Sequence, residues 1–265
     1  MSLQIDSMPQ QSLPASVYVL GVRVDRVSQL QVLDKIDRLI TSRRANDNTS
    51  PCQQIATVNT EFVMAAQKNR EFRYAINNAA LTVADGIGVV WATRFVGFPT
   101  PERITGTDTL VALAKRCAEK GYRIYLLGAA PGIAEQAGER LQVLAPGLQI
   151  AGAYAGSPAP EEADAIIERI HAANADIVCV AYGAPAQDLW IYRNLSRLPA
   201  AIAMGVGGAY DFLSGRQRRA PQVMQRMGLE WLYRLYREPW RWKRMLALPH
   251  FLIQVLLRGR KKRDA

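Results

Sequence analysis

A carboxylate followed by glycines is the stretch of this chain best suited to carry chemistry. Residues 81–90 read as a short apolar strand that ends at Asp85 and continues through Gly86, Ile87 and Gly88 into an apolar helix. A carboxylate at the carboxyl end of a strand lies where open α/β sheets bind ligands, and glycine lets a substrate approach the backbone closely. Asp85 is therefore a candidate general base, and Gly86 is a candidate substrate-binding residue. On this stretch alone, the alternative that Asp85 only N-caps the helix stays open.

Polar residues and glycines recur in the loops that follow four other predicted strands. In a doubly wound sheet such loops share one edge, so their side chains can converge on one ligand. The turn at 128–132 matches neither G-x-G-x-x-G nor the P-loop pattern, which disfavours a nicotinamide cofactor or ATP. Two simpler interpretations stay open, a plain turn at Gly128 and a solvent-exposed Gln187. The candidate binding residues in these loops are Thr57, Asn59, Gly128, Gly183, Gln187, Asp188, Gly207, Gly208 and Asp211.

Arg103 is a candidate for binding phosphate. It lies in a loop, residues 97–107, that is rich in Pro and Gly. Its guanidinium can offer two parallel N–H donors to a phosphate group. The alternative is an ordinary surface salt bridge with Glu102 or Asp108.

The residue inventory disfavours several other chemistries. The two histidines belong to no H-E-x-x-H motif and to no recognisable Ser/His/Asp arrangement. There is no Asp-x-Asp motif for a metal clamped by paired carboxylates, so neither a metal nor another cofactor is expected. The widely spaced Cys52, Cys117 and Cys179 suit a reduced, cytoplasmic protein. No signal peptide is expected, and the apolar run at 245–257 is too short and too interrupted to span a bilayer.

Strands of four to six mostly apolar residues alternate with amphipathic helices over residues 17–215. This alternation predicts an α/β fold, a Rossmann-like, mostly parallel sheet with helices on both faces. Residues 17–24 are expected to form a strand or hairpin. Ser28 is expected to cap the first long helix, and Thr107 or Asp108 a later one. Residues 1–16, which are polar and contain two prolines, are expected to be a mobile N-terminal arm.

The positive charge is concentrated at the end of the chain. Residues 216–265 hold 14 of the 33 Lys and Arg but only three of the 23 Asp and Glu, so this segment carries +11 and the rest −1. Aromatic residues are interleaved with the arginines, which predicts a helical appendage that binds an anionic membrane surface. A helix packed on the core with a solvated charged face, or nucleic-acid binding, are the alternatives. The candidate residues for binding a diphosphate are Arg234, Arg237, Arg241 and Arg244. Their spacing would place them in one stripe along a helix, but Pro239 must interrupt that helix.

Taken together, these motifs resemble the WecG/TagA/CpsF glycosyltransferases, family 26 of the sugar transferases. The resemblance covers about residues 17–244. One departure is Asp188, because the family usually has Glu after the glutamine. The matching stretches are Thr57-Val-Asn59-Thr-Glu61, Ala84-Asp-Gly-Ile-Gly88, Arg103-Ile-Thr-Gly-Thr-Asp108, Gly183-Ala-Pro-Ala-Gln187, Met204-Gly-Val-Gly-Gly-Ala-Tyr-Asp211, Arg219-Ala-Pro221 and Gly228-Leu-Glu-Trp-Leu-Tyr-Arg234.

The resemblance implies an inverting, metal-independent enzyme. Such an enzyme moves a sugar from a UDP-sugar to a polyprenyl-diphosphate-linked saccharide, peripherally bound at the cytoplasmic face of the cell membrane. Asp85 corresponds to the proposed base of the family. Thr57, Asn59, Arg103 and Gln187 correspond to residues that line the pocket, and with Asp85 they are the candidate catalytic residues. The C-terminal arginines would close over the diphosphate and touch the membrane.

The donor sugar is the least determined part of this expectation. The basic, Trp-rich end and the N-terminal arm resemble the glucosyltransferases of xanthan-type exopolysaccharide synthesis, which gives a small preference for UDP-glucose. The alternatives are the N-acetylmannosamine and N-acetylmannosaminuronic acid transferases of teichoic acid and common-antigen synthesis. From another class, a non-catalytic membrane-docking protein with a nucleotide-binding fold is also considered. Nucleic acid is not expected as a partner, and the sequence leaves a homo-oligomer open.

Overall fold

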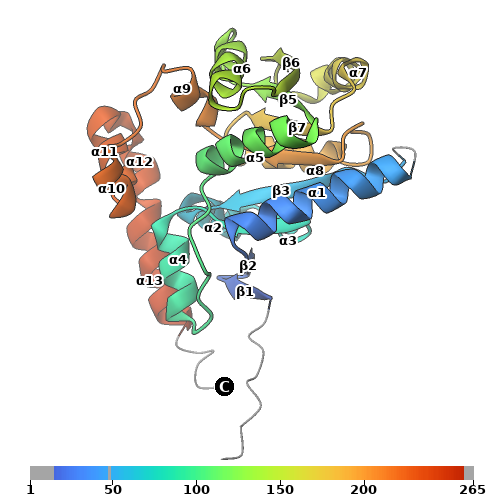
Figure 1. Cartoon of the computed structure of the whole chain (residues 1–265). Coiled ribbons are helices and arrows are strands. Elements are labelled where there is room, and N and C mark those ends of the chain that lie inside the picture. Colours follow the sequence, from blue (N-terminus) through green and yellow to red (C-terminus); the bar gives the residue numbers. More distant parts are fainter. Residues whose placement is uncertain (1–14, 47–48, 260–265) are drawn as a thin grey trace, which may run out of the picture.

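A six-stranded parallel sheet forms the centre of the molecule (Figure 1). The computed structural model describes residues 15–46 and 49–259. The strand order is β4-β3-β8-β7-β5-β6, and every neighbouring pair is parallel. The predicted α/β class with a mostly parallel sheet is confirmed. The strands are β3 (Gln53–Val58), β4 (Leu81–Ala84), β5 (Arg123–Gly128), β6 (Gln149–Tyr154), β7 (Ile177–Ala181) and β8 (Ile202–Gly205).

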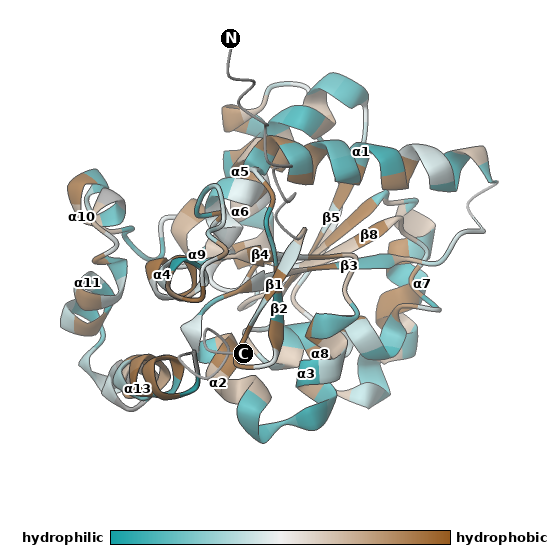
Figure 2. Ribbon diagram, turned by 90° about the horizontal axis from the view of Figure 1, so that it is seen from below, coloured by the Kyte–Doolittle hydropathy of each residue, from teal (hydrophilic) through white to brown (hydrophobic). Residues whose placement is uncertain are grey.

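Side chains along these strands alternate between two cores, because successive residues of a strand point to opposite faces. In β5, Ile124 and Leu126 belong to one apolar cluster, whereas Tyr125 and Leu127 belong to another on the opposite face. The first face is covered by α1 (Gln29–Ala45), α5 (Gly106–Lys120) and α6 (Ile133–Leu144). The second face is covered by α2 (Thr60–Lys68), α3 (Arg70–Asn77), α7 (Ala163–Ala173) and α8 (Ala186–Asn194). Figure 2 shows hydrophobic strands between helices whose outer sides are hydrophilic.

The predicted strand or hairpin near the N-terminus is a hairpin, formed by β1 (Ser16–Val19) and β2 (Val22–Asp25). Buried polar contacts join it to the edge of the main sheet: Asp25 accepts the backbone N–H of Thr82 at 2.8 Å, and the Arg23 guanidinium donates to Thr82 Oγ1 at 3.1 Å. The predicted mobile arm ended at residue 16, but Ser16 already belongs to β1. Residues 1–14 of that arm lie outside the described part of the chain.

Two helix starts can be compared with the caps predicted for them. Ser28 caps α1 through a capping box with Gln31, as predicted. The prediction that Thr107 or Asp108 caps α5 was wrong, because the cap is Thr105, whose hydroxyl accepts the Asp108 N–H at 3.2 Å. Asp108 therefore lies in the first turn of α5, where a carboxylate favours the helix N-terminus.

After β8, the secondary structure in the described part of the chain is helical. Pro239 interrupts the predicted arginine stripe, so its residues are divided among separate helical segments. Phe251 and Val255 are buried in the core cluster that contains residues of α2 and α4 (Ile87–Phe95). The last helix therefore packs on the sheet domain. The segments are α9 (Ala209–Leu213), α10 (Gln222–Arg226), α11 (Glu230–Arg237), a 3-10 turn (Pro239–Arg241), α12 (Trp242–Met245) and α13 (Ala247–Gly259).

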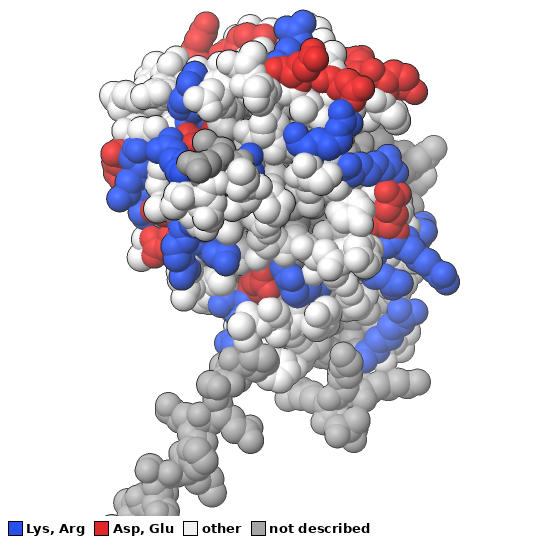
Figure 3. Space-filling view, turned by 90° about the vertical axis from the view of Figure 1, so that its right-hand side faces the viewer, with Lys and Arg blue, Asp and Glu red and all other residues white. Residues whose placement is uncertain are grey.

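None of the helices in the described ranges combines the length and apolar character needed to cross a bilayer. The side of the molecule away from the C-terminal helices carries both Lys/Arg and Asp/Glu side chains (Figure 3).

Candidate active site

A cavity of about 430 Å³ lies at the carboxyl ends of β3, β4, β7 and β8. Because these strands are parallel, the loops that follow them meet at one edge of the sheet, as the sequence predicted. Side chains of the C-terminal segments, Arg219, Glu230, Arg234 and Arg244 among them, form another part of the wall. The cavity is therefore built between the sheet edge and the C-terminal helices.

Asp85 directly follows β4 and lines this cavity. Its backbone N–H donates to the carbonyl of Val58 at 2.8 Å, and its carboxylate accepts the backbone N–H of Gly106. The N-cap of α4 is Gly86, with φ +102° and no side-chain capping bond, so Asp85 does not cap the helix. The positive φ explains the need for glycine at this position.

Burial raises the pKa of Asp85 to about 6. Surrounding protein atoms replace water, which disfavours the charged carboxylate. The Gly106 N–H and the charges of Arg103 and Arg234 act in the opposite direction, while the charge of Glu230 raises the pKa further. A carboxyl group with a pKa near 6 is mostly ionised at neutral pH and still basic enough to accept a proton.

Thr57, Asn59 and Gln187 all reach the cavity. Thr57 Oγ1 donates to the Gly205 carbonyl at 3.4 Å. Asn59 caps α2 by accepting the Phe62 N–H at 3.1 Å, so its amide NH₂ is the part suited to donate to a ligand. These contacts hold the two polar side chains at the carboxyl end of β3.

Gln187 is buried, with 1% of its surface exposed, so the alternative of a solvent-exposed residue was wrong. Its Oε1 accepts the backbone N–H of Gly207 at 3.0 Å, which joins the loops after β7 and β8. A Cβ at position 205 would lie 2.4 Å from Gln187 Nε2, so Gly205 makes room for this amide. Gly183, Gly207, Gly208 and Asp211 also line the cavity.

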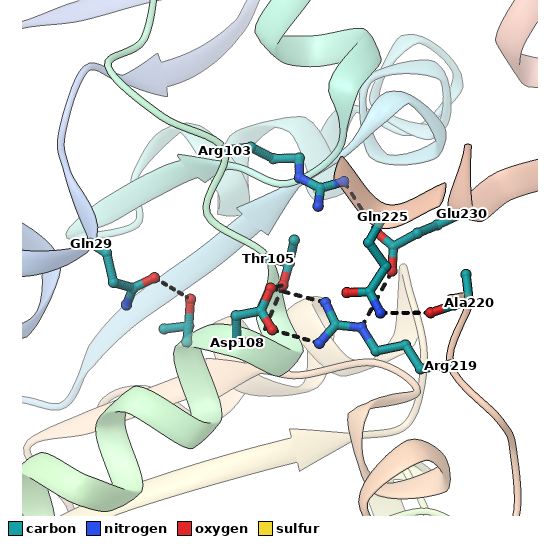
Figure 4. Close-up of polar contacts among 9 residues, drawn as sticks. Gln29, Arg103, Thr105, Asp108, Arg219, Ala220, Gln225 and Glu230 are labelled. Atoms are coloured by element: carbon teal, nitrogen blue, oxygen red, sulfur yellow. Dashed lines mark hydrogen bonds and ion pairs between the residues drawn. The ribbon is translucent and has the colours of Figure 1, made fainter. Parts of the chain in front are cut away.

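Arg103 belongs to a network of charged side chains over the cavity (Figure 4). It donates to Glu230 at 3.1 Å, not to its sequence neighbours Glu102 or Asp108. Arg219 contacts the same Glu230 at 3.3 Å and binds both oxygens of Asp108. The Arg219 guanidinium beside Asp108 lowers the pKa of that carboxyl group. This network connects α11 to the loop that precedes α5.

The four arginines of the predicted stripe have different surroundings. Arg234 lines the cavity with its guanidinium 4.6 Å from the centre of the Phe212 ring. Arg244 also lines it, and its Nε lies 3.0 Å from Glu61 on α2. Arg237 is exposed and is not part of the cavity wall, and the side chain of Arg241 lies outside the described atoms.

Besides Arg237, the predicted binding residues Gly128 and Asp188 do not line the cavity. A Cβ at Gly128 would lie 2.8 Å from the Ala181 backbone, so glycine is needed there for close strand packing. Asp188 is fully buried next to Gln187, with Gln54 Nε2 3.4 Å from its Oδ1, and burial raises its pKa to about 7. The shorter acid at this position is therefore an internal group, not one that faces a ligand.

Sequence reasoning did not select Gly106, Arg219 or Glu230 as site residues. Gly106 acts through its backbone N–H, which no side-chain pattern reveals. Gly106, Arg219 and Glu230 all lie within the motifs that carry the family resemblance, which was the available signal. Among the described residues, no group of three or more His, Cys, Asp or Glu is placed to hold a metal ion.

The fold and the cavity define a Rossmann-like α/β protein with a cavity at the carboxyl edge of a parallel sheet, where sheets of this type bind ligands. The model of the glycosyl transferase WecG/TagA/CpsF family matches residues 17–265, and the chain belongs to this family. The N-acetylglucosaminyldiphosphoundecaprenol N-acetyl-beta-D-mannosaminyltransferase of Bacillus spizizenii is 34% identical over 229 residues, 84% of this chain and 88% of that protein. The protein of the same name from Bacillus subtilis is 35% identical over 209 residues, 79% and 81% of the two chains.

Proposed function

We propose that this protein transfers N-acetylmannosamine from its UDP derivative to N-acetylglucosamine carried on a polyprenyl diphosphate. The observation that carries the proposal is Asp85, a cavity carboxylate with a pKa of about 6 that faces arginines. Both Bacillus relatives are named for transfer of N-acetylmannosamine to such an acceptor. The preference for UDP-glucose finds no support in these relatives, and the N-acetylmannosamine alternative fits better.

The proposed reaction is a single displacement with inversion at the anomeric carbon. A hydroxyl oxygen of the acceptor sugar attacks that carbon, and its proton passes to the Asp85 carboxylate. The bond between the anomeric carbon and the UDP oxygen breaks, and UDP leaves with the electron pair. Only one base is needed, because no protein side chain forms a covalent intermediate.

Arginines supply the positive charge on the leaving-group side in this proposal. Arg103, Arg234 and Arg244 all reach the cavity wall. Guanidinium groups bind phosphate oxygens through two parallel hydrogen bonds and stabilise the negative charge that develops on UDP. Thr57, Asn59 and Gln187 supply neutral donors suited to sugar hydroxyls or phosphate oxygens. No metal is invoked.

The C-terminal helices are proposed to hold the protein on the inner face of the cell membrane. Several of their aromatic side chains are exposed, including Tyr236 at 82%, Trp240 at 72% and Trp242 at 54%. Aromatic residues beside arginines favour the headgroup region of an anionic bilayer. Such a position would bring the cavity to a lipid-linked acceptor.

The test is a transfer assay with polyprenyl diphosphate N-acetylglucosamine and a panel of UDP-sugars. We expect product with the N-acetylmannosamine donor and little with the glucose or N-acetylmannosaminuronic acid donors. Asp85→Asn should lower transfer by about 10²–10⁴-fold while binding UDP as the wild type does. A folded wild-type protein that transfers no sugar from any donor would refute the enzyme proposal and favour a docking protein without turnover.

A further inference from the structure

An apolar groove of about 320 Å³ lies between α4 and α13. Ile87 and Trp91 line it from α4, and Leu248, Phe251 and Leu252 line it from α13. The two helices lie side by side in Figure 1, and α13 is largely hydrophobic in Figure 2. Leu252 is 43% exposed and Ile87 is 44% exposed, so apolar surface faces solvent here. A groove of this size and lining suits an apolar chain.

The groove continues from the cavity that holds Asp85. Ile87, Gly88 and Leu248 line both of them. Gly88 also brings α4 close to α2, because a Cβ there would lie 2.5 Å from Thr60 Cγ2. A ligand bound in the cavity can therefore extend into the groove without leaving the protein surface.

We infer that the groove binds the first isoprenoid units of the acceptor lipid, an inference that rests on the proposed transfer to a polyprenyl-diphosphate-linked sugar. That acceptor is linear: its sugar hydroxyl must reach Asp85, the diphosphate follows the sugar, and the isoprenoid chain follows the diphosphate. The structure offers the same order of chemistry. The carboxylate lies in the cavity, Arg244 lies on its wall four residues before Leu248, and the apolar groove begins at Leu248.

The groove is distinct from the apolar surface suited to the membrane itself. Ile253 and Leu257 of α13 are 54% and 68% exposed but do not line the groove. A flat bilayer surface can contact these exposed side chains, whereas a single lipid chain is needed to fill a concave groove. Substitutions on the same helix can therefore separate the two roles.

The experiment compares two acceptors in solution without membrane or detergent. Both carry N-acetylglucosamine diphosphate, one on a farnesyl chain and the other on a methyl group, an alkyl group too short to fill the groove. The wild type should have the higher kcat/KM with the farnesyl acceptor. Leu252→Gln, which makes the groove polar, and Leu252→Trp, which fills it, should reduce that advantage about tenfold, the scale expected for one leucine contact. The matched control, Leu257→Gln, should keep the advantage.

Transfer to the alkyl acceptor should be unchanged in all three variants, which shows that they fold and that the chemistry is intact. An unchanged farnesyl advantage in both Leu252 variants would overturn the inference. The inference would also be overturned if Leu257→Gln lost as much of the farnesyl advantage as Leu252→Gln does. The same conclusion would follow if the only effect of Leu252→Gln were weaker pelleting of the protein with anionic vesicles. If the wild type used neither acceptor with any donor, the proposed function itself would be refuted.

Discussion

Replacing Asp85 with Asn should make the protein more stable at neutral pH while it loses turnover. Asp85 has its pKa raised from 3.8 to about 6 in the folded protein, so the folded state binds this proton more tightly than the unfolded chain does. The stability that comes from this preference is fully present below pH 3.8 and is lost as the pH rises through about 6. At pH 7 the ionised, partly buried carboxylate therefore lowers the free energy of unfolding, and a neutral amide of the same shape avoids this cost.

The magnitude follows from the shift of about two pKa units, at about 1.4 kcal/mol per unit. Asp85 faces the cavity and is partly accessible to water, which reduces this value to about 1–3 kcal/mol. For a chain of this size, such a gain raises the melting temperature by roughly 2–10 °C. Turnover should fall by about 10²–10⁴-fold, the usual contribution of a positioned base.

The assay is thermal unfolding of the wild type and Asp85→Asn between pH 4 and pH 8, together with single-turnover transfer. The difference in unfolding free energy should be close to zero near pH 4 and should grow until about pH 7. In the wild type, kcat/KM should fall about tenfold per pH unit below pH 6, because only the ionised carboxylate accepts a proton.

Asp188→Asn is a matched control, since burial also raises the pKa of Asp188, to about 7, but its side chain does not line the cavity. This variant should gain stability at high pH and retain turnover. Asp85→Asn with full turnover would refute the role of Asp85 as base. Asp85→Asn with no stability gain at pH 7 would refute the argument from burial.

Three further predictions concern the surroundings of Asp85. Glu230→Gln removes a negative charge that raises the pKa of Asp85, so the acidic limb of the pH–rate profile should move to lower pH. The same variant loses its ion pairs with Arg103 and Arg219, which should lower the free energy of unfolding in urea by about 1 kcal/mol. Gln187→Ala leaves the Gly207 N–H without its acceptor and should cost about 1–3 kcal/mol of stability and raise KM for the donor. Transfer should continue in EDTA; loss of activity that Mg²⁺ restores would contradict the metal-independent mechanism.

Much of the architecture could be predicted because it depends on local patterns. The strand at 81–84 and the hairpin at 16–25 match the periodicity of their sequences. The α5 cap was misplaced by two or three residues because Thr105, Thr107 and Asp108 are all good capping residues, and only backbone geometry selects among them. Helix boundaries are set by such small differences, whereas the existence of the helix is set by its whole apolar face.

The site was only partly predictable, because its members come from distant parts of the chain. Thr57, Asn59 and Asp85 could be selected since each follows a strand of a parallel sheet. Gly128 satisfied the same rule, yet it serves strand packing against Ala181. The alternative considered for Arg103 was a salt bridge with a sequence neighbour, but its guanidinium pairs with Glu230, which lies 127 residues further along the chain.

By itself, the sequence determined the alternation of strands and helices, the sheet edge where the cavity lies, and the carboxylate that follows Leu81–Ala84. Those features depend on residues that are close together in the chain. Only the tertiary structure decided that the N-cap residue of α4 is Gly86 and not Asp85. It also decided that the Asp188 side chain is buried and that an apolar groove continues from the cavity. Burial and the pairing of charges depend on which residues pack against a side chain. Many of those residues are distant in the chain, so local sequence patterns do not identify them.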